Sequence, residues 1–88
     1  MLIYKVLKET EFSELEHKRK SQGSASDRLD GFIHLSTRKQ LPTTLEKHFY
    51  KERNLILMAI QSKTISKNLK WEKSRDEDLF PHLYRELH

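Results

Sequence analysis

The sequence predicts one α+β domain over residues 1–88, with a small mixed or antiparallel sheet and two main helices. The chain has 88 residues and no cysteine, so one small core without disulfides must hold it together. Apolar residues recur at helical spacing in two stretches, and the short runs around them are typical of strands. The helices are expected at 10–20 and 42–52, and the strands at 2–7, 32–36, 55–60 and 69–72.

The first expected strand, 2–7, is followed by a helix that Thr10 can cap. Glu11 and Glu14 then lie near the helix start, where the helix dipole favours negative charge. Residues 21–26 are small and polar, so we expect a loop there.

The second helix is expected to begin at Pro42, a residue that favours the first helical position. Thr37 and Gln40 have the spacing of a capping box, but a helix running straight from Thr37 would lose a backbone bond at Pro42. Residues 37–41 are therefore expected to form a turn. His48 lies at the border of the apolar stripe, which favours a boundary residue over a ligand.

Residues 55–60 are all apolar, which predicts a strand buried on both faces at the centre of the sheet. A polar connection, 61–68, follows it, with one helical turn expected from Thr64. Alternation in the next strand directs Trp71 to the core and Glu72 to the opposite face. Pro81 argues against a regular central strand, so residues 79–84 are expected at an edge of the sheet or in an extended turn.

Charge and hydropathy limit the classes of function. The net charge is +4, with 34% charged and 35% apolar residues, and the basic residues are scattered along the chain. The one basic triplet, Lys18–Lys20, is typical of a solvated helix end, so nucleic acid is not an expected partner. The first residues are too short and too charged a run for a signal peptide or a membrane span, which predicts a cytoplasmic protein.

The most informative stretch runs from Asp30 to Ser36. Asp30 and Gly31 indicate a turn, and alternation after it places Phe32, His34 and Ser36 on one side of a strand. An imidazole and a hydroxyl on one side suit a pocket that binds a polyhydroxyl ligand. A surface-facing histidine and a helix-capping serine would explain the same pattern.

Several motifs follow one another along the chain. They are Gly23-Ser24 with Asp27, the run Asp30–Thr37, Gln40, Thr44, His48-Phe49, the run Leu69–Glu72 and the run Phe80–Tyr84. Over essentially its whole length the chain resembles the small bacterial family called domain of unknown function nine-five-two. Members resemble a reduced ADP-ribosyltransferase-like fold and are sometimes loosely labelled glutathione-transferase-like.

The chain departs from the family at two points. Arg85 stands where glycine is usual, and the chain stops at His88 where members commonly continue into further strand-forming sequence. Two interpretations stay open: the chain is naturally short, or residues 1–88 omit a tail that carries a C-terminal strand segment. An open sheet edge favours self-association, so the expected state is a monomer or a weak homodimer.

The resemblance implies a nucleotide ligand, with NAD first among the cofactors. In the ADP-ribosyltransferase-like superfamily a histidine followed two residues later by serine contacts the ribose and nicotinamide of NAD, as His34 and Ser36 would here. We assign catalysis to Glu72 and His34, because a carboxylate can stabilise positive charge on the ribose. The expected substrate contacts are Ser36, Phe32, Asp30, His82 and Tyr84.

Structural explanations compete with these roles. Glu72 can be a solvated carboxylate paired with Lys70 or Lys73, and His82 can satisfy a buried backbone carbonyl. A zinc site of His34, His82 and Glu72 is not expected, because the three residues come from distant segments. Three classes of function stay open: an enzyme acting on NAD or a related nucleotide, a non-catalytic nucleotide or metabolite-binding module, and a protein-interaction domain.

Overall fold

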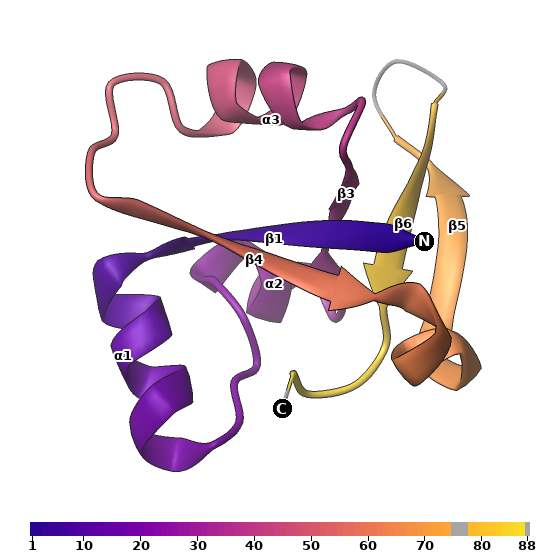
Figure 1. Ribbon diagram of the computed structural model, residues 1–88, viewed down its shortest axis with the longest axis horizontal. Coiled ribbons are helices and arrows are strands. Elements are labelled where there is room, and N and C mark those ends of the chain that lie inside the picture. Colours follow the sequence, from indigo (N-terminus) through magenta and orange to yellow (C-terminus); the bar gives the residue numbers. More distant parts are fainter. Residues whose placement is uncertain (75–77, 88) are drawn as a thin grey trace.

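The computed structural model describes residues 1–74 and 78–87, and its strands form two three-stranded sheets (Figure 1). The first sheet has the order β3-β1-β4 and the second the order β2-β6-β5, with every pair antiparallel. The strands are β1 (Leu2–Lys8), β2 (Ile33–His34), β3 (Ser36–Thr37), β4 (Leu55–Gln61), β5 (Leu69–Lys73) and β6 (Leu79–Leu83).

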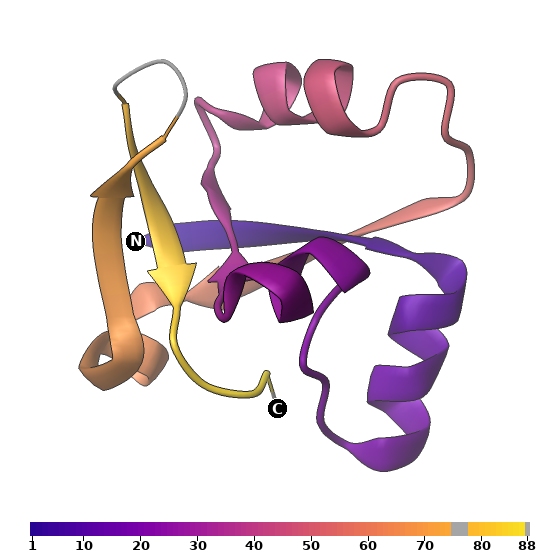
Figure 2. The same cartoon turned by 180° about the vertical axis from the view of Figure 1, so that it is seen from behind.

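Helices cover both faces of the first sheet. Helix α3 lies on one side, whereas α1 and α2 lie on the other (Figures 1 and 2). No helix in the described residues is long and apolar enough to cross a membrane. The helices are α1 (Glu9–Lys18), α2 (Ala25–Asp30), α3 (Leu41–His48) and the 3-10 helix η1 (Ser62–Asn68).

The core lies where the inner faces of the two sheets meet α1 and η1. Fully buried Leu7 on β1 and Leu83 on β6 show that both central strands contribute to it. The α+β class is therefore confirmed, with two small sheets in place of one. The cluster consists of Ile3, Leu7, Leu15, Ile33, Leu35, Ile65, Leu83 and Leu87.

The two expected helices form, with shifted ends. Helix α1 ends at Lys18 instead of residue 20, because Arg19 takes the left-handed conformation with a φ of 60°. Helix α3 begins at Leu41, one residue before Pro42, and ends at His48 instead of residue 52. Thr37 and Gln40 do exchange hydrogen bonds, each backbone N–H donating to the other's side-chain oxygen, and they close the turn before α3.

Helix α2 was not expected, since residues 21–26 were interpreted as a loop. Ser24 caps the helix by accepting a hydrogen bond from the Asp27 N–H, and the Asp27 carboxylate accepts one from the Ser24 N–H. This is a reciprocal capping box with aspartate in place of the usual glutamate. Gly31, with a φ of 83°, ends the helix.

The strand expected at 32–36 is divided between the two sheets. His34 pairs with His82 in the second sheet, whereas Ser36 pairs with Tyr4 in the first. Buried Leu35 lies at the crossing point between them. The crossing separates the two polar side chains that simple alternation placed together.

The prediction that 55–60 forms the buried centre of the sheet is wrong. Strand β4 lies at the edge of the first sheet, and β1 is central. Leu57 is 54% exposed, so only one face of β4 packs against the core. An apolar run does not distinguish a central strand from an edge strand whose second face is open.

The expectation for Pro81 is also wrong, because β6 is the central strand of its sheet. The two residues of β2 pair with Leu83 and His82 of β6. Pro81 is the next residue along β6, just beyond the last of these pairs. The missing N–H of Pro81 therefore breaks no ladder, while its carbonyl still accepts a hydrogen bond from the Leu35 N–H at 3.0 Å.

Trp71 was expected in the core and is instead 39% exposed on edge strand β5. Alternation along β5 still turns Glu72 to the opposite face, where the polar cluster described next lies.

Candidate functional site

Asp27 is the centre of a buried polar network between the two sheets. Its side chain is 1% exposed, and one carboxylate oxygen, Oδ2, accepts hydrogen bonds from Lys5 Nζ at 2.7 Å and from the Ser24 N–H at 2.9 Å. The other oxygen, Oδ1, accepts from the His34 N–H at 3.1 Å. Lys5 also donates to the His34 carbonyl at 3.1 Å, so β1, α2 and β2 are joined at one point.

His34 lies between two carboxylates. Its Nδ1 is 2.6 Å from Asp27 Oδ1, and its Nε2 is 3.0 Å from Asp30 Oδ2. Both ring nitrogens can donate at once only in the protonated imidazolium form. The buried Asp27 fixes the ring orientation, while Asp30, with a side chain 47% exposed, contacts the solvent-facing edge.

Burial of Asp27 opposes its ionisation, but the hydrogen bond to His34 and the charge and hydrogen bond of Lys5 outweigh that effect. They lower the pKa of Asp27 from 3.8 to about 2. The ionised carboxylate therefore stabilises the folded state.

We expect an acid-dependent loss of stability from this group. Its contribution is complete above pH 3.8 and disappears as the pH falls through about 2. The shift corresponds to about 2 kcal/mol of unfolding free energy. Urea unfolding at pH 5 and near pH 2 measures the loss in the native protein. Asp27→Asn, which lacks the titrating group, should lose about 2 kcal/mol less over the same interval, and an equal loss would contradict the assignment.

A second imidazole–carboxylate pair comes from β5 and β6. Glu72 Oε1 lies 2.9 Å from His82 Nδ1 and accepts a hydrogen bond from the Tyr84 hydroxyl at 2.6 Å. The Tyr84 and His82 hydrogen bonds hold the pKa of Glu72 below its usual value, and the Glu72 carboxylate raises the pKa of Tyr84. Because a carboxylate only accepts, His82 carries its proton on Nδ1 toward Glu72.

Phe32 joins the two pairs. Its ring stacks on His82 with centroids 4.2 Å apart and lies 4.7 Å from His34 and 5.2 Å from Tyr84. The two imidazole centroids are 5.4 Å apart. Residues from three separate segments thus form one polar and aromatic cluster, which we call the histidine cluster: Asp27, Asp30, Phe32, His34, Glu72, His82 and Tyr84.

A pocket of about 260 Å³ adjoins the histidine cluster. Phe32 and Tyr84 line it, and so do the guanidinium-bearing Arg28 and Arg85. Arg28 lies 3.6 Å from Glu14 across a solvent-exposed contact, so its charge is only weakly engaged. Aromatic and basic residues therefore line one small cavity together. The remaining lining residues are Gln22, Asp27, Gly31, Ile33, Leu83 and Glu86.

Of the site residues predicted from sequence, six lie in the histidine cluster and Ser36 does not. Ser36 is buried in the first sheet, and its hydroxyl is 2.9 Å from that of Thr44 on α3. The sequence interpretation missed Asp27 and Lys5. The capping spacing from Ser24 to Asp27 was a usable signal for the start of α2. Nothing in the sequence around Lys5 indicated that this lysine forms a buried ion pair.

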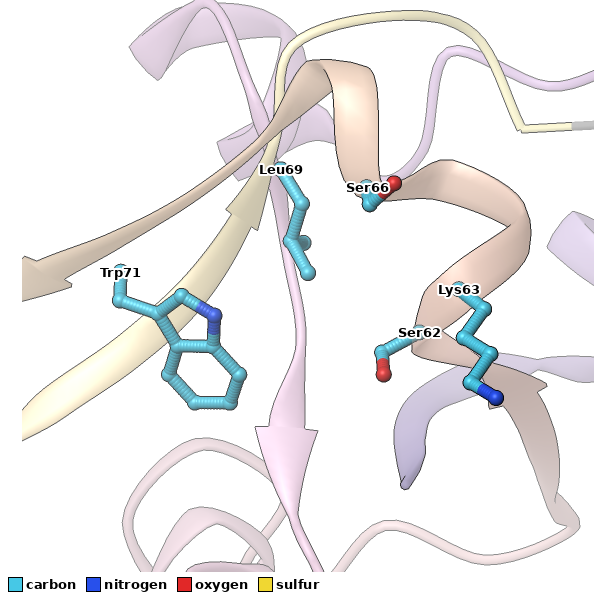
Figure 3. A pocket seen from close by; sticks show the side chains of 5 residues that line it. All are labelled: Ser62, Lys63, Ser66, Leu69 and Trp71. Carbon is cyan, nitrogen blue, oxygen red and sulfur yellow. The ribbon is translucent and has the colours of Figure 1, made fainter.

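A second groove, of about 470 Å³, is lined by none of the residues of the histidine cluster. Figure 3 shows it from close by. The Trp71 indole and the Lys63 side chain flank it on opposite sides, with the Ser62 hydroxyl between them. Trp71 alternates with Glu72 along β5, so this groove opens on the other face of that sheet. Among the described residues, no group of three or more histidine and carboxylate side chains is arranged to hold a metal ion.

Comparisons with known proteins identify related chains. A family described as Protein of unknown function (DUF952) matches residues 6–88. The crystal structure of protein CC0527 from Caulobacter crescentus is similar, with a TM-score of 0.94 and 44% identity over 99% of this chain and 76% of that one. Its solution NMR structure gives a TM-score of 0.85 at 44% identity, over 98% and 74% of the two chains. No curated protein matches this chain.

Proposed function

The chain belongs to the DUF952 family, and from the geometry of its site we propose that it binds a nucleotide, NAD or a relative of NAD, beside the histidine cluster. The observation that carries the proposal is the adjoining pocket, whose lining combines two aromatic residues with two arginines. A flat base or nicotinamide ring can pack against Phe32 and Tyr84, and guanidinium groups bind phosphate through paired hydrogen bonds.

The histidine cluster supports a ribosyl ligand in particular. Glu72 is oriented by His82 and Tyr84, and both hydrogen bonds favour its ionised form. A fixed carboxylate beside a ribose can stabilise the positive charge that grows when the bond from nicotinamide to ribose breaks. In this proposal nicotinamide leaves with the electron pair of that bond, and water or another acceptor attacks the ribose. The ADP-ribosyltransferase-like fold and activity are part of the same proposal.

One observation favours a non-catalytic binding module as the second candidate. Both ring nitrogens of His34 already face carboxylates, Asp27 and Asp30, so a base role would require Asp30 to move away. Under this alternative His34 positions the ligand, and no bond is broken. The cytoplasmic location stays a prediction under both candidates.

Calorimetric titration with NAD, ADP-ribose and ATP tests the proposal. Arg85→Ala should weaken binding by about 10- to 150-fold, because a charge-assisted hydrogen bond contributes about 1.5–3 kcal/mol. Arg38→Ala, an exposed arginine before α3, should leave binding unchanged. If none of the three ligands binds at millimolar concentration, the nucleotide proposal is contradicted and the protein-interaction domain becomes the favoured class of function.

Nicotinamide release from NAD separates the enzyme from the binding module. Glu72→Gln keeps the size of the side chain and removes its charge. If the domain is an enzyme, this variant should bind NAD about as well as the native protein and release nicotinamide at least about a hundredfold more slowly. A native protein that binds NAD and releases no nicotinamide would select the binding module.

A further inference from the structure

Strand β4 presents a long edge without charge. It pairs with β1 along its whole length and with no other strand of the described chain. None of its seven residues is charged, although 34% of the chain is. Natural proteins usually protect such edges with charged residues or prolines. In the second sheet, the longer of the two edge strands, β5, follows that practice with Lys70, Glu72 and Lys73.

The backbone of β4 shows which groups face the free edge. The Ser62 N–H donates to the Met1 carbonyl, and the register pairs Ile60 with Ile3, so alternate residues of β4 direct their N–H and C=O groups to β1. The residues between them, Leu55, Leu57 and Ala59, direct theirs outward.

Both ends of this edge are defined. Asn54 has a φ of 57° and turns the chain before the strand. At the other end the Gln61 carbonyl accepts a hydrogen bond from the Thr64 hydroxyl at 2.7 Å. Three outward positions centred on Leu57 are thus available, and the Leu57 side chain is itself 54% exposed.

We propose that this edge binds the β4 strand of a second copy of the chain, antiparallel and centred on Leu57. Leu57 then pairs with the partner's Leu57, and Leu55 pairs with the partner's Ala59, so each outward N–H meets a carbonyl. The first sheets of the two copies then form one continuous sheet of order β3-β1-β4-β4-β1-β3, and the dimer has closed two-fold symmetry.

A second copy is favoured as the occupant because β4 is complementary to itself in this register. The outward positions are symmetric about Leu57, and an uncharged strand brings no like charges together across the axis. Strand β5 carries two lysines, so self-pairing of β5 would bring like charges close together. The proposed interface belongs to the first sheet, whereas the nucleotide pocket borders the second. A failed test of the dimer therefore leaves the nucleotide proposal untouched, and a failed test of nucleotide binding leaves the dimer proposal untouched.

Analytical ultracentrifugation tests the dimer. The apparent mass should rise from 10.6 kDa toward twice that value as the concentration increases from about 10 µM to about 1 mM, the range of a small, weak interface. Leu57→Lys places two ammonium groups side by side at the axis and should keep the mass at one chain. Leu79→Lys, at a leucine 51% exposed and outside β4, should dimerise like the native protein. A monomer mass at 1 mM, or a Leu57→Lys variant as dimeric as the native protein, would overturn the proposal.

Crosslinking tests the register. Because the chain has no cysteine, Leu57→Cys introduces a unique thiol. In the proposed dimer the two Leu57 Cα atoms lie about 5.5 Å apart, within the range that a disulfide spans. Mild oxidation should convert Leu57→Cys to a covalent dimer at least about tenfold faster than the equally exposed Leu79→Cys. Equal rates for the two variants would overturn the register and the interface.

Discussion

Replacing Asp27 with alanine is expected to reduce the free energy of unfolding by about 3–5 kcal/mol, because it removes one partner of a buried ion pair. Of the two acceptors that Lys5 Nζ contacts in the folded protein, only the His34 carbonyl would remain, and the Lys5 side chain is just 6% exposed. The Ser24 cap of α2 would lose its reciprocal partner as well. Folded domains are typically stable by only about 5–15 kcal/mol, so urea unfolding should reveal the loss clearly.

Asp30→Ala is the matched control. Asp30 contacts the same imidazole, but its side chain is 47% exposed, and exposed ion pairs contribute about 0–1 kcal/mol. Replacing both Lys5 and Asp27 with apolar residues of similar size should recover part of the loss, since no buried charge is then left alone. Equal losses for Asp27→Ala and Asp30→Ala would contradict the network described here.

Gly23→Ala is expected to cost about 2–4 kcal/mol, from backbone strain and crowding together. The Gly23 φ is 88°, a conformation that alanine adopts with difficulty, and a Cβ atom there would meet the Asp27 carboxylate. That carboxylate cannot easily turn aside, because Lys5, Ser24 and His34 hold it. Thermal and urea unfolding both measure the effect.

Gly31→Ala separates the two causes. Its φ is 83°, almost the same as that of Gly23, but a Cβ atom added there has no neighbour within 4 Å. Only the backbone term of about 1–2 kcal/mol should appear. If both variants lose the same stability, the close packing of Gly23 on Asp27 contributes nothing.

The sequence was informative where local rules decide the structure. The position of Pro42 located the start of α3 to within one residue, and the turn expected before it is closed by the hydrogen bonds between Thr37 and Gln40. Strand β1 forms where the sequence predicts a strand at 2–7 and extends one residue further, to Lys8. The sequence misled where tertiary position decides. The apolar run of β4 is compatible with a centre or an edge, and Pro81 fits a central strand only because β2 stops short beside it.

The candidate site shows the same division. Alternation placed His34 and Phe32 on one face, and they do contact each other. The same rule joined Ser36 to them, but the crossing at Leu35 moves Ser36 into the other sheet. Asp27 gave no sign of its central position, because a buried carboxylate is recognised by its partners, and Lys5 lies on a strand distant in sequence.

An NMR titration of the histidine imidazoles with ADP-ribose tests the nucleotide site most directly. The resonances of His34 and His82 should shift together and saturate, because their rings lie 5.4 Å apart beside the pocket. His17, exposed on α1, should not move and serves as an internal reference. Unchanged His34 and His82 resonances at millimolar ADP-ribose, NAD and ATP would contradict nucleotide binding at this cluster.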